Sequence, residues 1–241
     1  MNRQKNLEKI KKMTGVAMFA ALAYVSVAVL RIPNIGGFLT MDFKDVIIAI
    51  CGMFFGPLAA LSLSVLVPLL EMVTVSGTGV YGFIMNVLSS MAFSLTASII
   101  YKYKKTLVGA IIGLLSAVFA VTAVMMAANL LVTPYYMNMP TAAVAQLIPK
   151  LLLPFNFTKA VLNASLTLML YKPLTSIMRK TGFFGKRSVK LEKTQEEKRK
   201  GRVRSAIIFA VSLVIVIVAL ALILFVWNGE ISFFDIFKSK S

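Results

Sequence analysis

Three polar side chains recur at helical spacing inside an apolar segment. Asn156, Lys159 and Asn163 follow one another at intervals of three and four residues, so they share one face if the segment is helical. An amide group both donates and accepts hydrogen bonds, whereas a lysine ammonium only donates. In lipid, a charge at the membrane centre costs about 2.5–3.5 kcal/mol and usually faces a cavity or a partner. The stripe therefore predicts a surface that recognises one polar ligand.

Polar residues on other apolar segments fall near the same predicted depth. They are Asp42, Lys44, Asp45, Glu71, Asn86 and Asn129. Any single Asn could instead link neighbouring helices, since amides commonly hydrogen-bond across membrane bundles. Lys159 could extend to lipid headgroups, and Asp42 and Asp45 could cap a helix. The set as a whole favours a ligand site.

The elements that carry these residues are predicted to be membrane helices. The chain has 241 residues, of which 59% are hydrophobic and 15% charged, whereas a soluble domain has about 45–50% apolar residues. Because about 20 apolar residues cross a bilayer core, the apolar runs predict an all-α integral membrane protein. The expected helices cover about 13–31, 43–55, 57–75, 80–101, 107–132 and 153–176, with an additional one at 206–227.

Composition divides the chain into three parts. Residues 1–181 form a six-helix membrane domain, 182–204 a basic linker, and 205–241 a seventh transmembrane helix with a short external tail. Lys and Arg are retained on the cytoplasmic side, so the basic N-terminus and linker are predicted to be cytoplasmic. The connections at 32–42, 74–80 and 133–152 then face outward.

The outward connection at 32–42 contains two glycines followed by mostly apolar side chains. Gly36 and Gly37 precede Phe38, Leu39, Thr40 and Met41. A loop of this kind fits a lid that closes over a ligand and excludes water, and it fits an interfacial anchor equally well.

Several functional classes are disfavoured. The net charge is +17, but the basic residues lie between apolar runs rather than on the soluble face of a nucleic-acid binder. The chain has no histidine, and the acidic residues of the six-helix domain form no metal-ligand or catalytic spacing, so we expect no enzyme, metal site or cofactor. A self-sufficient secondary carrier usually shows paired halves or a mid-membrane carboxylate, and neither is recognised.

Four stretches in order resemble the riboflavin-specific S components of energy-coupling-factor (ECF) vitamin transporters. They are Leu39-Thr-Met-Asp-Phe-Lys-Asp-Val46, Ser76-Gly-Thr-Gly-Val-Tyr-Gly-Phe-Ile-Met-Asn86, Asn129-Leu-Leu-Val-Thr-Pro-Tyr-Tyr136 and Leu153-Pro-Phe-Asn-Phe-Thr-Lys159. The resemblance covers about residues 10–178. It implies a six-helix subunit of the bacterial plasma membrane that captures riboflavin from outside. It also implies partnership with a transmembrane coupling subunit and two ATPase subunits.

The resemblance also implies roles for particular residues. The flavin ring edge would be held by Asn129, Asn156 and Lys159, while Asp42 and Asp45 would accept from the ribityl hydroxyls or position the lid. The remaining predicted ligand contacts are Asn86, Asn163, Tyr135, Phe38, Leu39, Thr40 and Met41. Ala17 and Ala21, four residues apart, match the small-residue spacing with which such subunits approach the coupling subunit.

Two features leave alternatives open. Residues 182–241 lie beyond the six-helix pattern, so it is open whether this subunit docks on the coupling subunit in the way usual for the family. Because the pocket residues are what differ among S components, a subunit for another vitamin or cofactor precursor is the main alternative to riboflavin.

Overall fold

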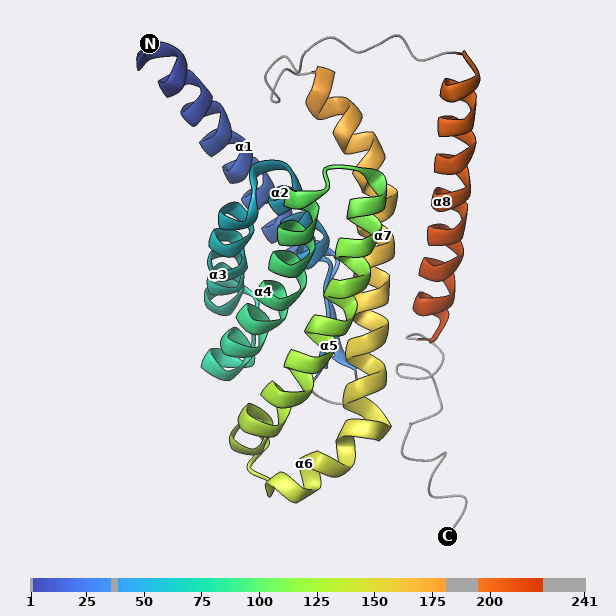
Figure 1. Ribbon diagram of the computed structural model, residues 1–241. Helices are drawn as coiled ribbons and strands as arrows, with labels where there is room; N and C mark the ends of the chain where they lie inside the picture. Colours follow the sequence, from blue (N-terminus) through green and yellow to red (C-terminus); the bar gives the residue numbers. More distant parts are fainter. Residues whose placement is uncertain (1, 36–38, 181–194, 223–241) are drawn as a thin grey trace.

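The protein is a bundle of helices with one small hairpin, described by a computed structural model at residues 2–35, 39–180 and 195–222 (Figure 1). The helices are α1 (Asn2–Val29), α2 (Lys44–Phe55), α3 (Pro57–Thr74), α4 (Gly79–Tyr103), α5 (Leu107–Met137), α6 (Thr141–Leu147), α7 (Leu153–Lys180) and α8 (Gln195–Leu222). A π-helical turn, Ile148–Leu152, joins α6 to α7. Strands β1 (Ile32–Ile35) and β2 (Leu39–Met41) pair antiparallel between α1 and α2.

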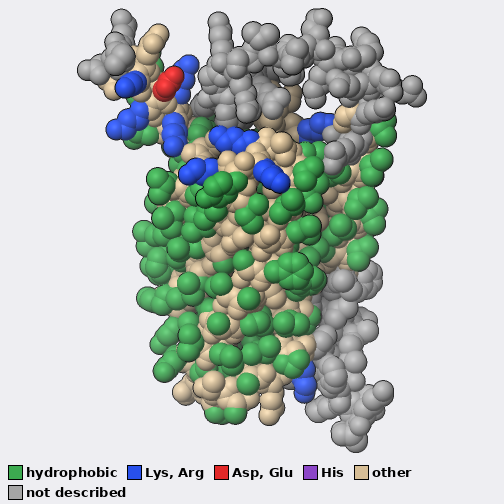
Figure 2. Space-filling view, viewed as in Figure 1, with side chains coloured by type: hydrophobic (Ala, Val, Ile, Leu, Met, Phe, Trp, Pro, Cys, Tyr) green, Lys and Arg blue, Asp and Glu red, His purple; other side chains and the backbone are tan. Residues whose placement is uncertain are grey.

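Length and apolarity identify an integral membrane protein. Within the described residues, four segments are long and apolar enough to cross a bilayer: Gln4–Val29, Pro57–Thr74, Gly79–Tyr103 and Leu107–Met137. α7 is long enough, but Asn156, Lys159 and Asn163 lower its hydropathy. α8 contains a shorter apolar segment, Ala206–Ala221. Figure 2 shows hydrophobic side chains over the sides of the bundle and Lys and Arg gathered at the end that holds the N-terminus.

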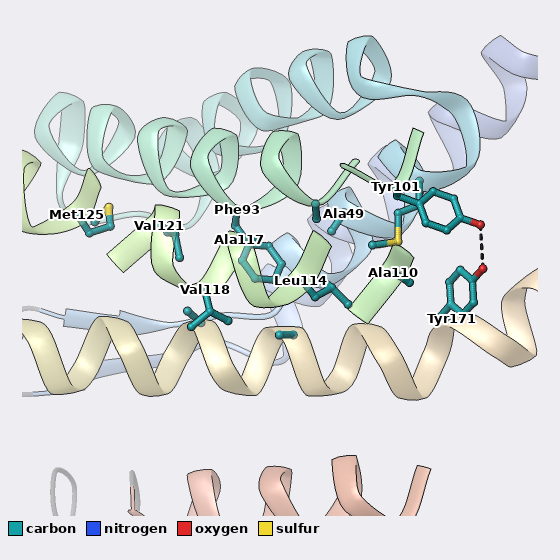
Figure 3. Close-up of a cluster of buried hydrophobic side chains, with 14 residues drawn as sticks. Ala49, Phe93, Tyr101, Ala110, Leu114, Ala117, Val118, Val121, Met125 and Tyr171 are labelled. Carbon is teal, nitrogen blue, oxygen red and sulfur yellow. Dashed lines mark hydrogen bonds between the residues drawn. The ribbon is translucent and has the colours of Figure 1, made fainter. Parts of the chain in front are cut away.

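Helix packing places α4 and α5 at the centre. α4 contacts α2, α3 and α5, α7 packs on α5, and α1 packs on α2 and α3. Phe93 of α4 and Leu114 of α5 are buried where α4, α5 and α7 meet (Figure 3). At the end of this core, the hydroxyl groups of Tyr101 and Tyr171 are 2.8 Å apart and hydrogen-bonded. That bond ties α4 to α7 without leaving a buried hydroxyl unpaired.

The chain breaks between α2 and α3 at Gly56 and Pro57. Gly56 separates the two helices with φ at +101°, a conformation that favours glycine, and Pro57 begins α3. The predicted boundary between the helices at 43–55 and 57–75 is therefore confirmed. α5 ends at Asn138, which adopts the left-handed conformation with φ at +50°, as helix C-termini often do.

Several predicted boundaries were wrong. The interval 133–152 was predicted to be an external loop, but it contains the last turn of α5, α6 and the π-helical turn. Residues 32–42, predicted to be a loop, contain β1 and β2. α1 and α8 begin at Asn2 and Gln195, each about three helix turns before the predicted starts at 13 and 206. Apolar periodicity cannot mark such ends, because Lys, Arg, Gln and Glu form helices readily without it. Residues 223–227 of the predicted seventh helix lie outside the described part of the chain.

Close packing around Gly52 gives a test of this arrangement. A Cβ atom at Gly52 would lie 2.7 Å from Ala60 Cβ and 2.8 Å from Ser98 Cβ, so α2 would have to move away from α3 and α4. Gly52→Ala is expected to lower the thermal unfolding midpoint in detergent, because overpacking costs about 1–3 kcal/mol. Gly201→Ala, in α8 with open space around it, is the control and should leave the midpoint equal or raised. Equal midpoints for both variants would contradict the packing.

Candidate ligand-binding site

A cavity opens between the hairpin and helices α3, α4, α5 and α7. Its polar lining includes Thr40, Glu71, Asn86, Asn129, Asn156 and Lys159, and its apolar lining includes Leu39, Met85, Met125 and Phe155. Asn86 lies in the first half of α4, Asn129 late in α5 and Asn156 at the start of α7. All three therefore lie toward the end of the bundle opposite the α4–α5 connection. The unfilled space, including its open side, is about 740 Å³.

Four buried charges form a chain beside this cavity. Asp42 Oδ2 lies 2.8 Å from Lys159 Nζ and 2.9 Å from Lys44 Nζ, and Lys44 Nζ lies 3.1 Å from Glu71 Oε2. Asp42, Lys44 and Glu71 are each only 1% exposed. Buried charges are tolerated when they are paired and hydrogen-bonded. Two ammonium groups alternating with two carboxylates meet the pairing condition and join α2, α3 and α7, while Asp42 Oδ1 and Glu71 Oε2 accept no hydrogen bond from the described residues.

The same lysines reach the hairpin and α4. Lys159 Nζ donates to the backbone carbonyl oxygen of Thr40 at 3.3 Å. Lys44 Nζ donates to Asn86 Oδ1 at 3.2 Å. Each lysine therefore connects the ion chain to a residue that lines the cavity, so the cavity wall depends on these charges.

The asparagines keep hydrogen-bonding capacity beyond their own helices. Asn129 Nδ2 donates to the Met125 carbonyl at 2.7 Å, and its Oδ1 accepts from Thr133 at 2.9 Å. Asn156 Nδ2 donates to the Leu152 carbonyl at 2.8 Å. An amide offers two N–H groups and an oxygen with two lone pairs. Asn129 therefore keeps one N–H and one lone pair for a ligand, and Asn156 keeps one N–H and its carbonyl oxygen.

Aromatic rings stand at the cavity wall formed by the ends of α4 and α5. Tyr81 and Tyr136 both line the cavity, and their ring centroids lie 6.2 Å apart at an interplanar angle of 60°. Together with Met85, Met125 and Phe155 they give the cavity apolar walls. A few convergent polar groups between apolar walls are typical of a small-molecule site.

The structure gathers many of the predicted site residues around this cavity. Leu39, Thr40, Asn86, Asn129, Asn156 and Lys159 all line it. Asp42 instead holds the two lysines, and Asp45 accepts a hydrogen bond from Ser90. Asn163 is 2% exposed within the bundle and does not line the cavity. Phe38 lies outside the described residues.

Tyr135 and Met41 also differ from their predicted roles as ligand contacts. Tyr135 is 75% exposed and does not line the cavity, whereas its neighbour Tyr136 does. Successive helical residues point about 100° apart, so Tyr136 rather than Tyr135 lies toward the cavity at this end of α5. Met41 is fully buried among apolar side chains that include Phe155 and Leu162. Neighbouring strand residues face opposite sides, which separates Met41 from Thr40.

Sequence analysis missed further lining residues. Arg31 lines the cavity and donates to the Val75 carbonyl at 2.7 Å, although it was treated only as the end of a helix. Glu71 was noted as polar but not assigned to the site. Its pairing with Lys44 could have been suspected, because a buried carboxylate in a membrane segment needs a partner.

The apolar helical bundle, and its partly open cavity with a few polar groups between apolar walls, define a membrane protein that binds a small ligand. Residues 11–171 match the model of the family described as "ECF transporter, substrate-specific component". The match spans more than half of the chain, so the protein belongs to this family, whose members are the S components of ECF transporters.

Individual relatives agree with this assignment. The chain is 29% identical to "Riboflavin transporter RibU" of Staphylococcus aureus (strain TCH60), over 74% of this chain and 97% of that protein. It is 26% identical to "Riboflavin transporter FmnP" of Bacillus subtilis (strain 168), over 64% of this chain and 86% of that protein. A solved structure titled "Structure and mechanism of the S component of a bacterial ECF transporter" matches with a TM-score of 0.61 and 28% identity. It covers 71% of this chain and 99% of the solved chain.

Loss of one charge should unbalance the ion chain. Lys44→Met removes the ammonium that lies between Asp42 and Glu71 and leaves buried carboxylate charge uncompensated. Breaking a buried pair in this way costs about 3–5 kcal/mol, so a large fall in the thermal unfolding midpoint is expected. The control Lys102→Met alters an exposed lysine near the end of α4. A midpoint for Lys44→Met equal to that of the control would show that the ion chain does not stabilise the fold.

Proposed function

We propose that this S component captures riboflavin from outside the cell and delivers it inward with an ATP-driven coupling module. The main support is the meeting of Asn129 on α5 with Asn156 and Lys159 on α7 around one cavity. The similarity to two proteins named as riboflavin transporters supports the same ligand. The chain itself would hydrolyse nothing, since ATP hydrolysis would belong to the partner subunits.

The chemistry of the cavity suits a flavin. A flavin ring is flat and apolar over most of its area, and its pyrimidine edge carries both hydrogen-bond donors and acceptors. Asn129 and Asn156 supply both kinds of group, and Lys159 supplies donors. Tyr81 and Tyr136 would lie against the apolar parts of the ligand. In this proposal Asp42 and Asp45 position other residues rather than contact the ribityl chain, because Asp42 binds two lysines and Asp45 binds Ser90.

We further propose six membrane helices for the binding domain, formed by α1 to α5 and α7, with α8 as an additional span. The N-terminus would be cytoplasmic, because Lys5, Lys9 and Lys11 of α1 and Lys104 and Lys105 after α4 are exposed. Figure 1 shows the start of α1 and the α4–α5 connection at the same end of the bundle, the end at which Figure 2 shows Lys and Arg gathered. Retention of basic residues inside the cell would then place the open side of the cavity toward the exterior.

The coupling partner would meet α1. Ala17 and Ala21 are both exposed on this helix, and small residues four apart let two membrane helices approach closely. Neighbouring apolar side chains on α1, including Met18, Leu22 and Val25, are also more than half exposed. We propose that this face contacts the transmembrane coupling subunit, which would in turn carry the two ATPase subunits.

Riboflavin titration of the purified protein, followed by quenching of ligand fluorescence, tests the ligand. Asn129→Ala and Asn156→Ala are each expected to weaken binding by about 1–3 kcal/mol, the cost of leaving a buried polar group unpaired. Gln146→Ala, which removes an exposed amide of α6, is the control and should bind as the parent does. Absence of riboflavin binding, with tight binding of another vitamin, would assign the subunit to that vitamin.

Orientation can be tested by cysteine labelling in intact cells. Cys51 is the chain's one cysteine and is buried, so it should contribute little background. Gln146→Cys, on α6, should react with a membrane-impermeant maleimide added outside, because α6 lies at the proposed outer end. Lys104→Cys, at the opposite end of the bundle, should react only after the cells are opened. The reverse pattern would invert the proposed topology.

A further inference from the structure

Helix α8 is an addition to the family domain. The family match ends at residue 171, and α8 covers Gln195–Leu222. The solved S component is matched over 99% of its own length by 71% of this chain. α8 packs along α7 (Figure 1). The position of α8 therefore raises the question of what it adds to a domain that is otherwise complete.

One face of α7 supports the hairpin over the cavity. Phe155, Lys159 and Leu162 lie four and three residues apart and so share a face of the helix. Lys159 on this face holds the hairpin through the Thr40 carbonyl and through Asp42, the residue that follows β2. Phe155 also lines the cavity. The hairpin is thus fixed by polar contacts on its cavity side.

α8 adds apolar side chains to the cluster that packs against the hairpin. Val216 and Ala219 of α8 belong to one buried cluster with Met41 of β2 and with Phe155 and Leu162 of α7. Val216 is 7% exposed and Ala219 4%, whereas Val214 and Val218 on the other side of α8 are more than half exposed. The further side chains that pack against this cluster include Ile32, Leu39, Phe43 and Leu220. The hairpin and α8 therefore pack into the same apolar cluster.

We propose that α8 is a built-in clamp that slows opening of the β1–β2 hairpin and so slows exchange of the bound ligand. This inference rests on the proposed riboflavin site. Opening the hairpin would pull Met41 and Leu39 out of a cluster that α8 helps to bury. Each opening then gives up van der Waals packing between these side chains. A domain without α8 would have only lipid against this surface.

A clamp has a kinetic signature that a ligand contact lacks. Val216 and Ala219 do not line the cavity, so their removal takes no contact from the ligand. Loosening the clamp makes opening more frequent in both the empty and the loaded protein. Association and dissociation should therefore accelerate together while Kd changes little. Loss of a direct contact acts mainly on dissociation instead.

Stopped-flow measurement of riboflavin fluorescence on the full-length protein tests the clamp. The variant Val216→Ala/Ala219→Gly/Leu220→Ala reduces the side chains that α8 contributes to the cluster. Both rate constants are expected to rise about three- to tenfold, because the shortened side chains give up packing contacts that hold the hairpin closed. The control Val211→Ala/Val214→Ala/Val218→Ala makes comparable reductions on the exposed face of α8, where all three valines are more than half exposed, and should leave both rates unchanged.

The outcomes separate the clamp from the proposed function. Unchanged rates in the cluster variant, with riboflavin still bound, would overturn the clamp and leave the ligand assignment standing. A rise in dissociation alone would also overturn it, because that result indicates a direct ligand contact. Absence of riboflavin binding by the unaltered protein would instead refute the proposed function. Should the triple variant fail to fold, Val216→Ala against Val218→Ala carries the same comparison.

Discussion

The double pairing of Asp42 is the interaction on which the binding end of the bundle depends. Its carboxylate holds Lys44 of α2 and Lys159 of α7, and Lys44 in turn holds Glu71 of α3. Each of these charges would be very costly alone in an apolar surrounding. Their alternation makes the set nearly neutral and fixes three helices and the end of the hairpin relative to one another. The hairpin, α3 and α7, which this ion chain connects, form one part of the cavity wall, and α4 and α5 form the rest.

Charged and amide side chains have different roles at this end of the bundle because of this constraint. Full charges lie behind or at the edge of the cavity, where they bind other charges, while the amides of Asn129 and Asn156 line it. Amides are cheaper to desolvate than charges and can both donate and accept. An S component must release its ligand as well as capture it. A site of amides and apolar walls supports selective recognition without the tight hold of an unpaired ion.

Much of this architecture could be predicted from the sequence, because lipid leaves so few solutions for a spanning chain. The helix break at Gly56-Pro57 and the shared depth of Asn129, Asn156 and Lys159 needed only proline chemistry and helical spacing. Other features depend on tertiary packing that no local pattern encodes. Tyr136 rather than Tyr135 faces the cavity because of the rotation of α5 against its neighbours. α6 lacks the length of a spanning helix, and the basic start of α8 lacks apolar periodicity, so neither could be recognised by hydropathy.

The low hydropathy of α7 has a consequence for biogenesis. A segment that carries two asparagines and a lysine on one face is a poor candidate to leave the translocon alone for lipid. The carboxylate that neutralises its lysine, Asp42, is synthesised more than a hundred residues earlier and enters the membrane beside α2. α7 is therefore inserted most favourably after the earlier helices have assembled, because Asp42 is then present to neutralise Lys159. The ligand-binding end of the molecule would then be completed only in the final stage of membrane integration.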